Sequence, residues 1–152
     1  MDETLLTTGP GIPPMIWVFV GVIAFAFVIF LVVKIQRLFR RPDLYGMTRE
    51  DVQRRWIQIR ETSQKGMMGA KLAIMEADIL LDAALKSMTM PGTTLGERLR
   101  VACYKYPKLE RVWWAHKLRN RLVHESTYQI GPRQAHQALD EFERALKMLN
   151  LL

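Results

Sequence analysis

Ten consecutive residues, His116 to Glu125, concentrate side chains suited to acid–base and phosphate chemistry. The stretch reads HKLRNRLVHE and holds two imidazoles, three basic side chains, one amide and one carboxylate. An imidazole transfers protons near neutral pH, and a guanidinium binds phosphate through a planar fork of donors. These residues are therefore the first candidates for a catalytic or anion-binding site.

Helical periodicity places these groups on different sides of one predicted helix. Successive residues turn by about 100°, so Arg119 points out of the middle of the apolar arc, where an unpaired charge costs several kcal/mol. Asn120 lies one turn from both His116 and His124, within hydrogen-bonding reach of either imidazole. The two histidines are about 12 Å apart along the helix. This helix alone therefore predicts no metal site.

Two interpretations of these residues stay open. In the catalytic one, Arg119 and His124 act together. They lie about 140° apart on a regular helix, so they converge only if the helix loosens or if two copies face each other. In the structural one, Arg119 pairs with an acidic residue of another helix, such as Glu76 or Asp78. The further cations predicted to attract RNA or another anion are Lys117, Arg121 and Arg111.

The sequence LRNRLVHE, residues 118–125, resembles the signature of HEPN domains, which is an arginine, a polar residue, a short spacer and a histidine. Arg119, Asn120 and His124 match it residue by residue. The toxin branch of the family adds a tyrosine two places after the histidine, where this chain has Ser126, with Tyr128 two places further on. The chain is also similar to short bacterial proteins that join one membrane span to a helical domain with this motif.

The resemblance implies a fold, a partner and a reaction. HEPN domains are small helical bundles, and in many members two chains dimerise so that both copies line a metal-independent RNA-cleaving cleft. We therefore expect a homodimer and an RNA or nucleotide ligand, and we expect no metal or other cofactor. In cleavage by the RNA 2′-hydroxyl, His124 would move protons, Arg119 would hold the phosphate, and Asn120 would orient the imidazole or the substrate.

An uninterrupted apolar segment precedes the elements that carry these residues. Residues Met15–Val33 are 19 consecutive apolar residues, which as a helix extend about 28 Å and match the ~30 Å hydrocarbon core of a bilayer. A cleaved signal peptide has a basic flank before a shorter apolar stretch, whereas the flank here contains Asp2 and Glu3. The sequence predicts an uncleaved transmembrane helix at 15–33 after a disordered tail at 1–14.

Basic residues follow this span directly. By the positive-inside rule they place the C-terminal part in the cytoplasm and the tail outside, in a single-pass protein of the inner (cytoplasmic) membrane. Residues 34–47 are predicted to form a basic juxtamembrane segment and linker on the lipid bilayer. Each cation there gains on the order of 1 kcal/mol from anionic headgroups. The predicted headgroup-binding residues are Lys34, Arg37, Arg40 and Arg41.

Residues 48–151 show helical periods and no alternation typical of strands. Thr48 with Asp51 predicts a helix N-cap, Gly66 and Gly69 predict a break, and the TLGE sequence at 94–97 predicts a capping box. The fold class is all-α: a transmembrane helix followed by a cytoplasmic, HEPN-like bundle of about four helices. Later helices are expected to about Met88, from Thr94 through Ala102, from Lys108 to about Glu125 and from Pro132 to about Leu149.

The charge and cysteine content limit the classes of function that the sequence allows. The chain has 22 Lys+Arg and 15 Asp+Glu, and its only cysteine, Cys103, allows no internal disulfide. Residues 34–152 carry 22 basic and 13 acidic residues, a net +9, as in a domain facing nucleic acid, anionic lipid or the cytoplasm. The sequence predicts a module that binds RNA, nucleotide or a protein partner at the inner membrane face. The alternative is a membrane-tethered, metal-independent ribonuclease that uses Arg119 and His124.

Overall fold

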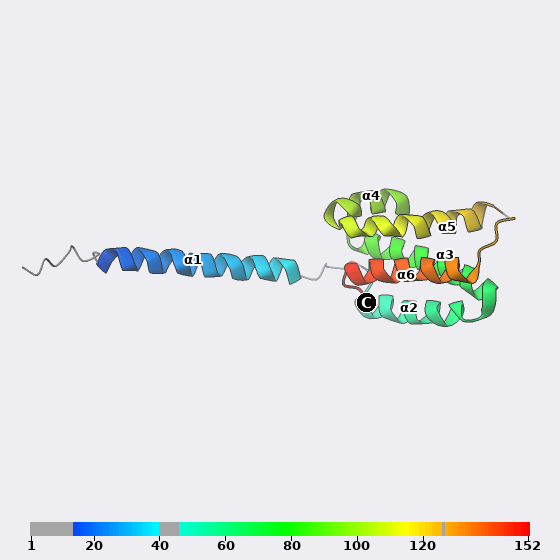
Figure 1. Cartoon of the computed structure of the whole chain (residues 1–152), viewed down its shortest axis with the longest axis horizontal. Coiled ribbons are helices and arrows are strands. Elements are labelled where there is room, and N and C mark those ends of the chain that lie inside the picture. The colour runs from blue at the N-terminus through cyan, green and yellow to red at the C-terminus, as the bar shows by residue number, and fades with distance from the viewer. Residues whose placement is uncertain (1–13, 40–45, 126) are drawn as a thin grey trace, which may run out of the picture. The chain divides into compact units, whose positions relative to one another are not determined.

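The chain divides into two compact units, residues 1–40 and 41–152. The computed structural model describes residues 14–39, 46–125 and 127–152, and these residues form helices and no strand (Figure 1). The predicted all-α class is therefore confirmed for this part of the chain.

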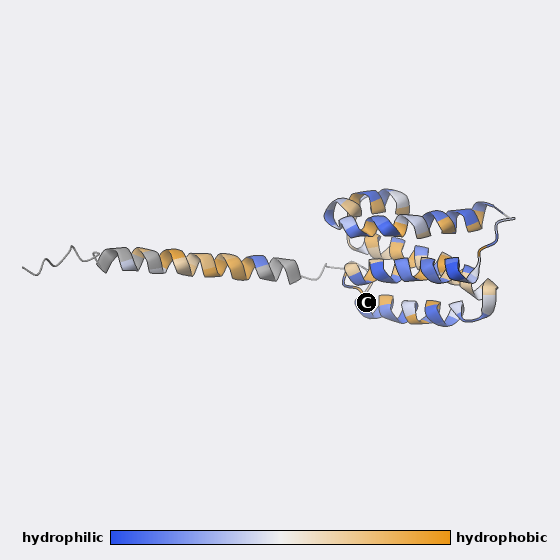
Figure 2. Cartoon of the chain, viewed as in Figure 1, coloured by the Kyte–Doolittle hydropathy of each residue, from blue (hydrophilic) through white to orange (hydrophobic). Residues whose placement is uncertain are grey.

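The first unit contains one helix, α1, Pro14–Phe39. The residues along its middle are apolar (Figure 2), and the described side chains from Gly21 to Val33 are exposed. Across the residues that the structure describes, no helix is both long enough and apolar enough to span a membrane. Some of the predicted features lie outside the residues that the structure describes. They are residues 1–13 of the predicted tail, the side chains of four residues of the predicted span (Met15, Ile16, Val18 and Val20) and three of the predicted headgroup-binding cations (Arg37, Arg40 and Arg41).

The second unit is a bundle in which one helix contacts all the other α-helices. Its α3 packs against α2, α4, α5 and α6, and Figure 1 shows α2, α6 and α5 running side by side with α3 behind them. The core is made of aliphatic side chains together with Trp56, Met88 and Phe142, all within residues 52–151. The helices are α2 (Arg49–Ser63), α3 (Gly66–Ser87), α4 (Leu95–Lys105), the 3-10 helix η1 (Pro107–Arg111), α5 (Val112–His124) and α6 (Pro132–Met148).

Side-chain caps start two of these helices. At α2, the Thr48 hydroxyl accepts from Asp51 N–H at 3.1 Å, which is the predicted N-cap. The Asp51 carboxylate in turn accepts from Thr48 N–H at 3.0 Å. These hydrogen bonds to Thr48 hold the pKa of Asp51 below its ordinary value. At α4 the predicted reciprocal box is only half formed. Thr94 caps Glu97 N–H, but the Glu97 carboxylate accepts from the N–H and hydroxyl of Thr93, one residue earlier than predicted.

Two glycines allow the tight turn between α2 and α3. Gly66 has φ +75°, a left-handed conformation that disfavours other residues. A Cβ on Gly69 would lie 2.2 Å from the carbonyl oxygen of Thr62, so only glycine permits this close approach. The break predicted between the two helices is confirmed.

The helix predicted from Lys108 to Glu125 is two elements. The 3-10 helix η1 comes first, with Leu109 N–H donating to the Tyr106 carbonyl at 2.9 Å, and α5 begins at Val112. Pro107 suits the first position of such a turn because proline lacks a backbone N–H, and an N–H at that position would have no partner within the helix.

Candidate functional site

The candidate site lies where α5 packs against α3. Val112, Ala115 and Leu118 are the buried face of α5 and fix its rotation against the core. His116, Arg119 and Asn120 stand on the flank of that face and are partly buried. His116 and Arg119 share a partner on α3, Asp78, whose side chain is only 5% exposed.

Four side chains close a ring of polar contacts. Asp78 Oδ1 lies 2.6 Å from His116 Nδ1, and His116 Nε2 lies 3.2 Å from Asn120 Nδ2. Asn120 Oδ1 accepts from Arg119 Nη1 at 3.1 Å, and Arg119 Nε lies 3.2 Å from Asp78 Oδ2. We call these residues, Asp78, His116, Arg119 and Asn120, the polar ring.

The contacts of the polar ring determine which of its atoms donate and which accept hydrogen bonds. Arg119 only donates, so the Asn120 oxygen must face it and the Asn120 amide nitrogen must face His116. His116 Nε2 then accepts, which leaves the imidazole proton on Nδ1, where it donates to Asp78. One arrangement of protons therefore gives each of the three hydrogen bonds of the ring one donor and one acceptor.

One contact of the ring is an ion pair without an aligned hydrogen bond. Arg119 Nε is buried and at ion-pair distance from Asp78, but it has no hydrogen-bond partner. A second ion pair lies close by along α3. Arg98 of α4 is buried, and its Nη1 is 2.6 Å from Asp82 Oδ1. The two aspartates of α3 therefore each hold an arginine of another helix.

A pocket of about 460 Å³ opens over the polar ring. The ring residues line it together with Ile79 and Asp82 of α3 and the start of α4. Gly96 contributes no side chain there, and a Cβ at that position would lie 3.8 Å from His116 Nε2. An imidazole, a guanidinium and an amide thus border a pocket that is open to solvent.

The predicted site residues do not all meet. Arg119 and Asn120 share the polar ring, but His124 is exposed at the end of α5, and no contact joins it to either of them among the described residues. The interpretation in which Arg119 pairs with Asp78 of another helix describes the observed contact. The loosening of the helix that would bring Arg119 and His124 together is not seen within α5.

The predicted anion-binding cations are exposed, and two of them have acidic neighbours. Arg121 pairs with Glu125 at 3.2 Å, which raises the pKa of this guanidinium, and Arg121 also lies over the ring of Tyr128. Arg111 lies 3.6 Å from Glu141. Lys117 is exposed on the same helix, and Lys34 is exposed on α1.

Two members of the polar ring were not predicted as site residues. His116 was considered for its distance from Asn120, and Asp78 only as a partner for Arg119. Their contact joins residues 38 positions apart, so no local spacing reveals it. The one available signal was the placement of Arg119 on an apolar face, which required an acidic partner from elsewhere.

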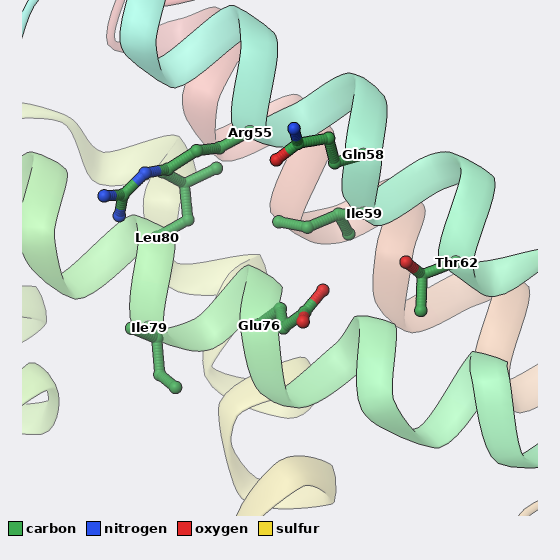
Figure 3. Close-up of a pocket in the computed structure, with 7 residues that line it drawn as sticks. All are labelled: Arg55, Gln58, Ile59, Thr62, Glu76, Ile79 and Leu80. Carbon is green, nitrogen blue, oxygen red and sulfur yellow. The ribbon is translucent and has the colours of Figure 1, made fainter.

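A second pocket, of about 390 Å³, lies between α2 and α3 (Figure 3). Arg55 and Glu76 border it from the two helices, but no ion pair joins them among the described contacts. Figure 3 shows the Arg55 guanidinium turned away from the Glu76 carboxylate. Across the described residues, no three potential ligands gather as a metal site.

Comparison of the chain with protein-family models, curated proteins and solved structures gave no match.

Proposed function

We propose that this chain is a membrane-anchored helical-bundle module that binds a partner protein at the cytoplasmic face of the inner membrane. In this proposal the HEPN-like motif holds the bundle together and does not cleave RNA. The observation that carries it is the polar ring, in which Arg119 and Asn120 already have partners from their own chain. A substrate phosphate would have to compete with Asp78 for the guanidinium.

The charges around α5 support a protein partner over RNA or a nucleotide. Three of the cations expected to contact phosphate lie beside carboxylates: Arg119 beside Asp78, Arg121 beside Glu125 and Arg111 beside Glu141. Each pair reduces the positive charge available to a polyanion.

The membrane anchor is part of the proposal and rests on the apolar run Met15–Val33 with Lys34 and three arginines after it. Its test is carbonate extraction of cell membranes together with a reporter fused to the C-terminus. We expect the chain to stay in the membrane pellet with the reporter active in the cytoplasm. Extraction into the soluble fraction or an exported reporter would overturn the anchor.

The claim that the motif holds the bundle together and does not cleave RNA is tested with the purified full-length chain in mild detergent, with single-stranded RNA and EDTA. We expect no cleavage, and we expect Arg119→Ala to lower the melting temperature because it opens the polar ring. His124→Ala is the matched control, since His124 is exposed and lies outside the ring. Metal-independent cleavage that is lost in either variant would contradict the proposal.

A metal-independent ribonuclease is the second candidate. The pocket over the polar ring favours it, because an imidazole and a guanidinium border one solvent-open space. The two motif-derived residues Arg119 and His124 do not meet in one chain, so this function requires a second copy to bring His124 in. Cleavage lost in both Arg119→Ala and His124→Ala, and restored by mixing the two inactive chains, would establish it.

A further inference from the structure

The direction of the hydrogen bonds in the polar ring depends on one proton. With a neutral imidazole, His116 Nδ1 donates to Asp78, and Nε2 accepts from the Asn120 amide nitrogen. The Asn120 oxygen then faces Arg119 Nη1, which donates to it at 3.1 Å. Because the Asn120 amide has an acceptor at one end and a donor at the other, it links the proton of His116 to the position of Arg119.

We propose that the polar ring is a pH-sensitive switch, in which protonation of His116 reverses the Asn120 amide and releases Arg119 from it. An imidazolium donates from both nitrogens, so a protonated Nε2 cannot face the Asn120 amide nitrogen, which also donates. A turn of the amide brings its oxygen to Nε2. Its nitrogen then faces Arg119 Nη1, which only donates, and that contact is lost. This inference does not depend on the membrane anchor or on the proposed binding role.

Arg119 has a second arrangement available because the observed one leaves part of its guanidinium unpaired. Its Nε is buried and lies 3.2 Å from Asp78 Oδ2, but this N–H has no hydrogen-bond partner. Once Asn120 no longer holds Nη1, the guanidinium can turn so that Nε aligns with Asp78, which satisfies a buried donor. Each arrangement therefore satisfies a donor that the other leaves unpaired, as in a two-state element that a single proton can bias.

Two groups of opposite charge face the imidazole from α3 and α5. Asp78 contacts His116 at 2.6 Å, and Arg119 contacts the same carboxylate. Asp82 borders the same pocket, but it is held by Arg98 at 2.6 Å. Among the described residues, Asp78 and Arg119 are therefore the charged partners of the ring that contains the imidazole.

The remaining elements around α5 place no charged group against His116 among the described contacts. α4 borders the pocket with residues 94–96, none of which titrates. Its first acidic residue, Glu97, accepts hydrogen bonds from the loop before the helix. The buried acid of α6, Glu141, lies beside Arg111 of η1. The proton that drives the switch is therefore assigned to His116.

The release of Arg119 changes the pocket over the polar ring. His116, Arg119 and Asn120 all line this pocket of about 460 Å³, and the Arg119 side chain is 24% exposed. With His116 neutral, Asn120 occupies Nη1 of the guanidinium. With His116 protonated, Nη1 faces the pocket beside an imidazole that has gained a charge. Acid therefore makes the pocket more positive and its guanidinium more accessible.

The switch is tested by nitrogen-15 NMR of the full-length chain, kept in solution with a mild detergent, between about pH 8 and pH 5. At the upper end we expect the His116 tautomer with its proton on Nδ1. As the pH falls, the signals of the Asn120 amide and the Arg119 Nε–H group should move with the same midpoint as the His116 ring. In His116→Gln both signals should lose their pH dependence, while the exposed His124 still titrates.

The variant Asn120→Asp separates the release of Arg119 from the protonation of His116. A carboxylate of the same shape only accepts, so it accepts from Arg119 Nη1 and from a protonated His116 Nε2 at once. The Arg119 signal should then stay constant with pH, while His116 stays protonated to a pH about one unit higher or more. Asn150→Asp is the matched control, since Asn150 is exposed and lies outside the ring, and it should leave both titrations unchanged. Circular dichroism checks that the variants stay folded.

Three results would overturn the inference. One is a neutral His116 with its proton on Nε2. Another is a His116 that stays neutral down to about pH 5. The third is an Arg119 signal that does not follow the titration of His116 in the unmodified chain, or that follows it equally in Asn120→Asp.

Discussion

Two arginines of α5, two residues apart in the sequence, differ in their burial and in their acidic partners. Arg119 reaches into the polar ring and contacts the buried Asp78, while Arg121 lies on the surface beside the exposed Glu125. The local sequence around them is equally basic, and only the direction of each side chain differs. A buried carboxylate without its partner is costly, whereas an exposed ion pair is screened by water and contributes little. The motif therefore has a structural half, Arg119 and Asn120, and a surface half, Arg121 and His124.

The largest expected effect comes from removing the acceptor of the polar ring. Asp78→Ala leaves His116 and Arg119 without their common partner, and we expect the free energy of unfolding to fall by about 3–5 kcal/mol. Urea denaturation followed by circular dichroism measures this. Asp140→Ala is the control, because Asp140 is 46% exposed and its contact with Arg60 is 3.6 Å long. A loss for Asp78→Ala no larger than that of the control would show that the ring does not stabilise the bundle.

Removing the guanidinium should cost less than removing the carboxylate. In Arg119→Ala, Asp78 keeps His116, so we expect a loss of about 2 kcal/mol. Arg119→Lys tests the geometry, since one ammonium group cannot replace both the Nε and the Nη1 contacts and should recover only part of that loss. Full recovery by lysine would mean that charge alone matters at this position.

Removal of a helix cap should cost an amount of stability between the losses at the buried and at the exposed contacts. Thr48→Ala should cost about 1 kcal/mol at neutral pH because α2 loses its N-cap. The hydrogen bonds with Thr48 lower the pKa of Asp51 below its ordinary value of 3.8. Their contribution to the free energy of unfolding is therefore fully present above that pH, and it is lost as the pH falls through the lower pKa of the folded state. The difference in stability between this variant and the unmodified chain should shrink in acid. A difference that stays constant down to pH about 2 would contradict the role of the carboxylate.

The smallest effect is expected at the surface half of the motif. Arg121→Ala and His124→Ala should each leave the melting temperature within about 1 °C, because both side chains are exposed. Differential scanning calorimetry is sensitive enough to see a larger change. A fall comparable with that of Arg119→Ala would remove the distinction between the two halves.

Much of the bundle could be predicted from the sequence because its signals are local. The cap at Thr48, the break at Gly66 and the apolar spacing from Ala135 to Leu149 each depend on neighbouring residues, and each corresponds to an observed element. The division of the third bundle helix into η1 and α5 was missed, since a 3-10 turn differs from an α-helical turn in hydrogen bonding, residues per turn and rise, and five residues of sequence do not reveal these differences.

The site was harder to predict because its contacts are tertiary. The placement of Arg119 on an apolar face indicated an acidic partner, and Asp78 was one of two candidates. The contact between His116 and Asp78 depends on how α3 and α5 pack, which no spacing within either helix defines. The motif resemblance drew attention to His124, which lies outside the ring, and away from His116, which lies in it.

The central claim is that Arg119 and Asp78 act on each other to hold α5 against α3. A double-mutant cycle with Asp78→Ala, Arg119→Ala and the double variant measures this directly from unfolding free energies. The account predicts a coupling of about 1 kcal/mol or more between the two residues. Losses that add within about 0.3 kcal/mol would contradict it.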